Sequence, residues 1–138
     1  RFGAGLQDQP IVYGTDYDTR DGSCIRDYIH VMDIAHGHTL ALRYLAEGRN
    51  SQNCEVFNLG SGQGVSVLEA IRSFEKVSGL KLDVTFGSRR PGDVIAIYAD
   101  NTKAREQLGW KATRDIDTMM SSAWAWEQKL AEGAAVKA

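Results

Sequence analysis

The stretch DGSCIRDYIHVMDIAHGH, residues 21–38, decides the fold, because its hydrophobic period changes partway along. In its first half, side chains fall on alternate faces, with Ile25 and Ile29 on one of them, which is typical of a β-strand. In its second half, apolar residues begin to recur every three or four positions, which is typical of an amphipathic helix. We expect Asp33 to cap this helix and Gly48 to end it.

The rest of the chain repeats this succession of short strands and helices. Further strands are predicted at residues 10–14, 54–60 and 81–86, and further helices at 66–79, 100–109 and 115–130. The last helix should turn one apolar face inward, formed by Ile116, Met119, Met120, Ala123 and Trp126. We therefore expect one α/β unit with three or four helices at residues 1–130, and a disordered tail at residues 131–138.

Composition excludes several classes of partner. Of the 138 residues 43% are hydrophobic and 25% charged, and the formal net charge is −2, so no global positive field recruits nucleic acid. No apolar run reaches the roughly 20 residues that cross a membrane. Cys24 and Cys54 are far apart and form no CxxC pair, which favours reduced thiols in a cytoplasmic protein. His30, His36 and His38 lack the spacing of a metal site, so we expect no metal.

A glycine-rich segment, NLGSGQGVSVLEAI, resembles a dinucleotide-binding loop at first sight. The spacing G-x-G-x-x-G would require a glycine at position 65, which is Val65. Ser66 and Glu69 have the spacing of a capping box, which explains them without a ligand. We interpret the segment as a tight turn between a strand and a helix.

Two adjacent arginines precede a Pro-Gly turn in FGSRRPGDVIAIYAD, residues 86–100. An arginine fork can hold a phosphate through two parallel hydrogen bonds. In an extended segment Arg89 and Arg90 should point in opposite directions, so we expect one of them to enter a site. Asp93 could be the partner of that arginine, or it could accept hydrogen bonds from sugar hydroxyls.

Taken together, TDYDTRDGSCIRDYIHVMDIAHGHTLAL, VFNLGSGQGVSVLEAI, RRPGDV and QLGW, in this order, resemble UDP-glucose 4-epimerases (UDP-galactose 4-epimerases). These enzymes belong to the extended short-chain dehydrogenase/reductase superfamily, which has a Rossmann-type fold. The resemblance covers residues 9–128, and its most specific stretch is DGSCIRDYIHVMDIAHGH. It implies that the chain is the carboxyl-terminal, substrate-binding part of a longer cytoplasmic enzyme.

The resemblance also implies roles for individual residues. By position, Arg26 and Arg90 match two arginines that clamp the diphosphate of a UDP-hexose, and Asp93 matches the acid that binds its ribose. Two guanidinium groups from separate segments can hold a diphosphate without a metal ion.

The same comparison extends to the two ends of the substrate. Ile11, Val12 and Tyr13 match the segment around the uracil base. Ile97 stands where the family often has Tyr or Cys beside the hexose, and it could equally be a core strand residue. Since Ile97 offers no hydrogen-bond donor, the preference between UDP-glucose and UDP-N-acetylglucosamine stays open.

The chemistry of the family lies outside this sequence. The resemblance implies that NAD takes a hydride from the hexose and returns it to the other face of a 4-keto intermediate. It also implies a homodimer and a Tyr-x-x-x-Lys pair in an amino-terminal domain. No tyrosine here is followed by lysine four residues later, so we expect no catalytic residue and no NAD site in this chain. On its own it should be inactive.

Two other interpretations remain open. The chain could belong to another nucleotide-sugar epimerase or dehydratase of the same superfamily, in which the arginines would persist and the sugar would differ. Alternatively, it could be a stand-alone nucleotide-sugar binding module with no catalytic partner.

Overall fold

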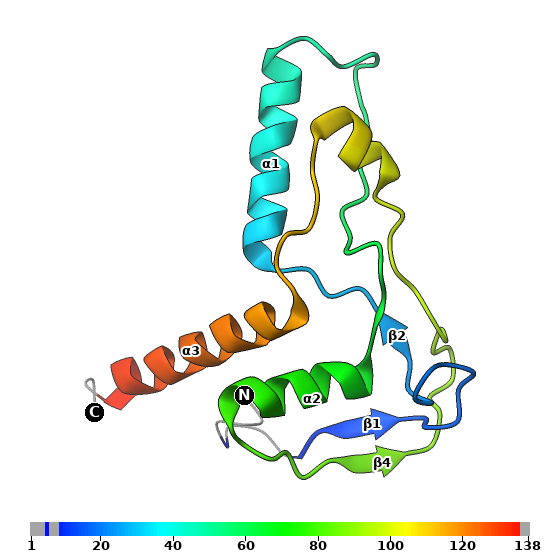
Figure 1. Cartoon of the computed structure of the whole chain (residues 1–138), viewed down its shortest axis with the longest axis vertical. Coiled ribbons are helices and arrows are strands. Elements are labelled where there is room, and N and C mark those ends of the chain that lie inside the picture. Colours follow the sequence, from blue (N-terminus) through cyan, green and yellow to red (C-terminus); the bar gives the residue numbers. More distant parts are fainter. Residues whose placement is uncertain (1–4, 6–8, 136–138) are drawn as a thin grey trace.

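Strands and helices alternate along the chain, as the sequence predicts (Figure 1). The computed structural model describes residue 5 and residues 9–135. The elements are β1 (Ile11–Tyr13), β2 (Ile25–Arg26), α1 (Val31–Ala46), β3 (Val65–Ser66), α2 (Val67–Ser78), β4 (Thr85–Gly87), a short π-helix η1 (Ala104–Leu108) and α3 (Ile116–Ala135). Short strands with four helices confirm the α/β class.

The strands form two small sheets. β1 and β4 pair in parallel, with Val12 opposite Phe86. β2 and β3 pair antiparallel, and a parallel bridge between Ile25 and Ala96 adds a third extended segment beside β2. The strand predicted at residues 54–60 is wrong for the part of the chain that the structure describes: this segment lies outside every strand. A strand requires backbone hydrogen bonds to a neighbouring strand, and these residues form none within the described part of the chain.

The start of α1 differs from the prediction. His30, not Asp33, caps the helix: its Nδ1 accepts a hydrogen bond from the Met32 amide at 3.0 Å. Asp33 lies in the first turn and is only 1% exposed. Its carboxylate accepts hydrogen bonds from Thr113 and from the backbone and side chain of Arg114. Asp33 therefore joins α1 to the segment before α3, which no local pattern indicates.

The termini of α2 confirm the capping signals. The Ser66 hydroxyl accepts a hydrogen bond from the Glu69 amide at 3.1 Å, and the Glu69 carboxylate accepts one from the Ser66 amide at 2.8 Å. Gly79 ends the helix with a φ of +71°, which glycine adopts without a steric penalty. The glycine-rich segment is thus a turn into a well-capped helix.

α2 and α3 pack against each other, and Ile116, Met119 and Met120 of the predicted inner face of α3 are half-buried. Phe74 and Trp124 meet edge to face, with ring centroids 5.6 Å apart. Ala123 and Trp126, both expected inside, are exposed. α3 also continues to Ala135, so residues 131–135 of the expected tail are helical, whereas residues 136–138 lie outside the described residues.

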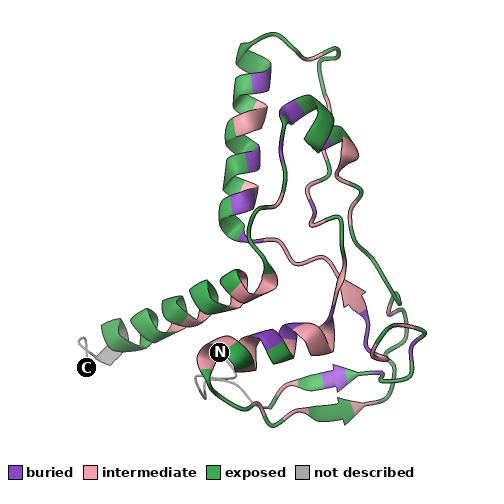
Figure 2. Ribbon diagram, in the orientation of Figure 1, coloured by how far each residue is buried: buried purple, intermediate pink, exposed green. Residues whose placement is uncertain are grey.

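The main apolar core lies between α1 and η1. It consists of Tyr44, Ala104, Leu108 and Trp110, with Phe57 packed against it. The indole N–H of Trp110 donates to the Asp33 carbonyl oxygen at 2.8 Å, so its one polar atom is satisfied. Figure 2 shows this core and the far, exposed end of α3, which runs out from the rest of the chain.

Candidate functional site

The parallel pair β1–β4 carries the first half of the candidate site. Val12 points inward and is 2% exposed, whereas its neighbours Ile11 and Tyr13 are 48% and 36% exposed. This alternation follows from the period of a strand. The Gly14 amide donates to the Gly87 carbonyl oxygen at 2.9 Å and continues the pairing toward the Pro-Gly turn. Tyr13 is therefore held on the surface directly beside the segment that bears the two arginines.

Arg90 lies across Tyr13. Its guanidinium carbon is 4.7 Å from the centre of the Tyr13 ring. Its Nε and Nη2 donate to the two carboxylate oxygens of Asp93 at 3.1 and 3.2 Å, which is a bidentate pair across the turn. The hydrogen bonds that Arg90 donates to Asp93 raise the pKa of Arg90, so this side chain carries its charge at every physiological pH.

Arg26 reaches the same carboxylate from β2. Its Nη1 donates to the carbonyl oxygens of Ile25 and Val94 at 2.8 and 2.6 Å, and its Nη2 donates to Asp93 Oδ1 at 3.4 Å. The side chain of Asp93 is only 12% exposed, and that of Arg26 is 28% exposed. The structure thus brings together Arg26, Arg90 and Asp93, three residues that the sequence predicts to share a site. Two cations face one carboxylate, which leaves an excess positive charge.

Arg89 has partners of its own. Its Nε donates to Asp16 Oδ1 at 2.8 Å, its Nη2 donates to the Asp16 carbonyl oxygen at 2.6 Å, and it lies 4.3 Å from the centre of the Tyr17 ring. Its hydrogen bond lowers the pKa of Asp16. Arg89 and Arg90 therefore contact separate partners, as expected for neighbours in an extended segment. Arg89 thereby connects the turn after β1, which contains Asp16 and Tyr17, to the turn that precedes Asp93.

Ile97 follows the bridge to β2 and is 57% exposed. Its amide donates to the Ile25 carbonyl oxygen at 3.1 Å, which fixes its backbone while the side chain stays at the surface. It is not a core residue. An exposed isoleucine beside Arg26's strand is available to a ligand.

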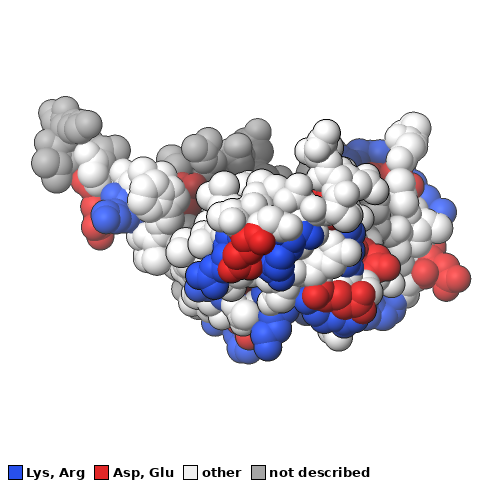
Figure 3. Space-filling view, turned by 90° about the horizontal axis from the view of Figure 1, so that it is seen from above, with Lys and Arg blue, Asp and Glu red and all other residues white. Residues whose placement is uncertain are grey.

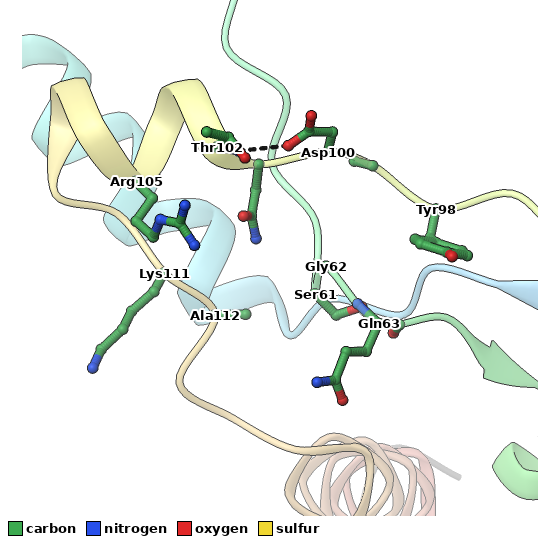
Figure 4. A pocket seen from close by; sticks show the side chains of 11 residues that line it. Ser61, Gly62, Gln63, Tyr98, Asp100, Thr102, Arg105, Lys111 and Ala112 are labelled. Atoms are coloured by element: carbon green, nitrogen blue, oxygen red, sulfur yellow. Dashed lines mark hydrogen bonds between the residues drawn. The ribbon is translucent and has the colours of Figure 1, made fainter.

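Two hollows lie near these residues. An apolar cavity of about 320 Å³ lies between β1 and α2, and Ile11 and Val12 line it. A more polar cleft of about 550 Å³ lies on the other side of the glycine-rich segment (Figure 4). Its labelled side chains include Gln63, Tyr98 and Arg105, which sequence reasoning did not single out. None of the seven predicted site residues lines this cleft.

The surface carries its charges in a mixed pattern. Figure 3 shows basic and acidic side chains interspersed over one face of the molecule, so an anion must be held by a local arrangement of side chains. Within the described residues, no helix combines the length and apolar character that crossing a membrane requires. In the same part of the chain, no group of three or more His, Cys, Asp or Glu side chains could hold a metal ion.

The glycine-rich segment does not have the geometry of a dinucleotide site. A Cβ at Gly60 would lie 2.3 Å from Asp27 Oδ2, and one at Gly64 would lie 2.2 Å from the Ile25 side chain. These glycines make room for the protein's own side chains. In a dinucleotide-binding loop they would make room for a pyrophosphate. The glycine-rich segment therefore does not fit NAD.

The chain is similar to known proteins over most of its length. Residues 1–123 match the family model described as GDP-mannose 4,6 dehydratase. The chain is 51% identical over 118 residues to UDP-glucose 4-epimerase 1 of Oryza sativa subsp. japonica, covering 86% of the chain and 33% of the relative. It is 44% identical over 129 residues to the UDP-glucose 4-epimerase of Bacillus subtilis (strain 168), covering 94% of the chain and 37% of that relative.

Solved structures give the same result. The UDP-glucose 4-epimerase of Stenotrophomonas maltophila, with bound NAD and formylated UDP-arabinopyranose, superposes with a TM-score of 0.89 at 42% identity, over 96% of this chain and 38% of that one. The Bifidobacterium longum enzyme, in complex with NAD⁺ and UDP, gives 0.83 at 44% identity, over 93% and 37%. The chain spans about a third of the length of the curated relatives it matches. It belongs to the extended short-chain dehydrogenase/reductase family that the GDP-mannose 4,6 dehydratase model describes, and it resembles the UDP-glucose 4-epimerases within it.

Proposed function

We propose that the chain is the substrate-binding portion of a UDP-glucose 4-epimerase, an isomerase that interconverts UDP-glucose and UDP-galactose with NAD. One observation carries the proposal: Arg26 and Arg90, from distant segments, converge on one carboxylate beside an exposed tyrosine ring. The resemblance to UDP-glucose 4-epimerases over most of the chain supports the same function.

In this proposal each site residue has a definite task. Arg26 and Arg90 hold the diphosphate, whose oxygens take the donors that Asp93 now accepts. Asp93 then turns to the ribose hydroxyls. The segment Ile11–Tyr13 holds uracil, and Ile97 contacts the hexose. A diphosphate carries more negative charge than one carboxylate, so it can displace Asp93 from both guanidinium groups.

The remaining parts of the activity belong to the rest of the longer protein. We place NAD and the catalytic residues outside these 138 residues, because the glycine-rich segment does not fit the cofactor. The relatives are about three times longer, which leaves room for a cofactor-binding domain. We further propose a cytoplasmic homodimer.

A second function is favoured by two observations. Ile97 has no hydroxyl or thiol to offer a sugar, and the matching family model is named for a dehydratase. Another nucleotide-sugar epimerase or dehydratase would keep the arginines and change the sugar. Turnover of UDP-glucuronate by the longer protein, with none of UDP-glucose, would favour this second function.

Calorimetric titration of the purified protein with UDP and with UMP tests the proposal. UDP should bind at least about tenfold more tightly than UMP, because the second phosphate adds charge-assisted hydrogen bonds to Arg26 and Arg90. Inorganic pyrophosphate should bind detectably at the same site and compete with UDP. Equal affinities for UDP and UMP would contradict a diphosphate clamp.

A further inference from the structure

Asp27 gathers three hydrogen bonds from two segments that are distant in sequence. Its Oδ1 accepts from the Ser61 amide at 2.9 Å and from the Ser61 hydroxyl at 2.7 Å. Its Oδ2 accepts from the Ala99 amide at 2.8 Å. The carboxylate thereby joins the glycine-rich segment to the residues just after Ile97. No role for Asp27 follows from the diphosphate clamp itself.

The surroundings of Asp27 are built for this contact. A Cβ at Gly60 would lie 2.3 Å from Asp27 Oδ2 and 2.6 Å from the Ala99 side chain. Any larger residue at position 60 would push the carboxylate away from the Ala99 amide. The first glycine of the glycine-rich segment is therefore explained by the approach of Asp27.

Asp27 directly follows Arg26, and the two residues fasten the two ends of one segment, residues 93–99. Arg26 holds its beginning through Asp93 and the Val94 carbonyl oxygen. Asp27 holds its end through the Ala99 amide. Between these points, backbone hydrogen bonds to Ile25 attach the segment to β2.

We propose that Asp27 is a positioning residue that fixes Ile97 at a set place relative to Arg26, and so determines how the site distinguishes a UDP-hexose from UDP. This inference rests on the proposed function. Ile97 is exposed, its amide is held by the Ile25 carbonyl oxygen, and Asp27 holds the backbone two residues further on, so these two contacts together set its place. Because the Arg26 contacts lie at the other end of the segment, losing Asp27 should loosen the backbone after Ile97 while the diphosphate clamp persists.

The test compares Asp27→Asn with the unsubstituted protein by calorimetry, with UDP and UDP-glucose as ligands. In the variant, an NH₂ group replaces Oδ1 or Oδ2. This group cannot accept the hydrogen bond that the replaced oxygen accepts, so at least one of the contacts to Ser61 and Ala99 is lost. We expect UDP affinity within about threefold of the original, and a fall of about fivefold or more in the ratio of UDP-glucose to UDP affinity. Hydrogen exchange at the Ala99 and Ser61 amides should become faster in the variant.

Glu55→Gln is the matched control. Glu55 accepts hydrogen bonds from the amide and the hydroxyl of one serine, Ser51, as Asp27 does from Ser61. It lies elsewhere in the molecule, near α1 and η1. Its substitution should leave the affinity ratio unchanged. If Asp27→Asn does not fold, Ser61→Ala removes one of the three hydrogen bonds and keeps the charge, and the ratio should still fall.

The outcomes separate the two proposals. A protein that binds UDP, and whose affinity ratio is the same with and without the Asp27 substitution, would overturn the positioning role alone. An equal fall in Asp27→Asn and Glu55→Gln would also overturn it, because the effect would then come from general loosening. No UDP binding in the unsubstituted protein would overturn the proposed function itself.

Discussion

Asp93 is the residue on which the candidate site is centred. Its carboxylate lies between two guanidinium groups, and without it their mutual repulsion would separate them. The arrangement therefore keeps two cations close together before any ligand binds. A ligand that supplies anionic oxygens meets donors that are already directed at one point, so less side-chain entropy is lost on binding.

Substitution of either clamp arginine should weaken UDP binding. Arg26→Ala and Arg90→Ala each remove charge-assisted hydrogen bonds to the diphosphate, so we expect UDP affinity to fall roughly 10- to 100-fold. Calorimetry measures this directly. Arg72→Ala is the control, because the Arg72 side chain is 66% exposed and its ion pair with Asp21 is long, at 4.0 Å. Unchanged UDP affinity in Arg26→Ala would remove this arginine from the clamp.

Arg89→Ala should have a different result from Arg90→Ala. Arg89 contacts Asp16 and Tyr17, so its loss should loosen the turn after β1 and lower the urea midpoint of unfolding. Exposed ion pairs contribute little, so the shift should be small. UDP affinity should stay within about threefold of the original. A loss of affinity as large as that of Arg90→Ala would show that Arg89 touches the ligand.

At the scale of single elements, α2 depends on its cap. Ser66→Ala removes a fully buried hydroxyl that accepts from the Glu69 amide and donates to Asp21. We expect a loss of about 1–2 kcal/mol of unfolding free energy. Urea denaturation measures it. Ser121→Ala, on the exposed side of α3, should change stability by less than about 0.5 kcal/mol. Equal effects of the two substitutions would contradict the capping argument.

The connection between α1 and the segment before α3 should make stability depend on pH. Burial alone would raise the pKa of Asp33, but hydrogen bonds from Thr113 and Arg114 lower it by more. Since the pKa is depressed in the folded state, the stabilisation is present above the unfolded value of about 3.9 and is lost as pH falls through the folded value.

Asp33→Asn tests this pH dependence. At pH 7 the substitution should cost about 1–3 kcal/mol, because the buried side chain no longer accepts all the hydrogen bonds from Thr113 and Arg114. The difference between Asp33→Asn and the original protein should shrink as pH falls from about 5 to 2. Urea midpoints at several pH values measure it. A difference that does not vary with pH would show that Asp33 stabilises the fold by hydrogen bonding alone.

At the scale of the whole molecule, neither the glycine-rich segment nor residues 54–60 has the structure that its sequence pattern first suggests. The glycine-rich segment is filled by Asp27 and Ile25, so it offers no place for NAD. Residues 54–60, expected as a strand, form no strand within the described residues, although positions 55, 57 and 59 are half-buried and positions 56 and 58 exposed. The burial of these residues alternates as in a strand, but no neighbouring strand pairs with them within the described residues.

The chain of 138 residues, given NAD and UDP-glucose, should therefore produce no UDP-galactose. A coupled assay for UDP-galactose measures this. The same chain should still bind UDP, because the clamp residues are all present. Turnover by these residues alone would contradict the division of the site that we propose.

Helices and strands can be predicted where they depend on local signals in the sequence. Features that depend on contacts between distant residues cannot. The cap of α2 and the glycines that end the helices act within a few residues, so their patterns are readable in the sequence. The start of α1 was predicted wrongly because Asp33 has the residue type of a cap. Its partners Thr113 and Arg114, some 80 residues away, could not be seen. The inner face of α3 is predicted correctly at Ile116, Met119 and Met120 but not at its outer part, where Trp124 packs on Phe74 of α2 and Ala123 and Trp126 are exposed.

The sequence by itself determined the α/β class, the caps of α2 and the resemblance to UDP-glucose 4-epimerases, because these depend on the identity and spacing of neighbouring residues. Only the tertiary structure decided which carboxylate meets which arginine and what the glycine-rich segment encloses. Arg26 meets Asp93 across 67 positions, and Asp27 meets Ala99 across 72. Such contacts exist only once the strands have paired, since pairing is what brings distant segments within hydrogen-bonding distance.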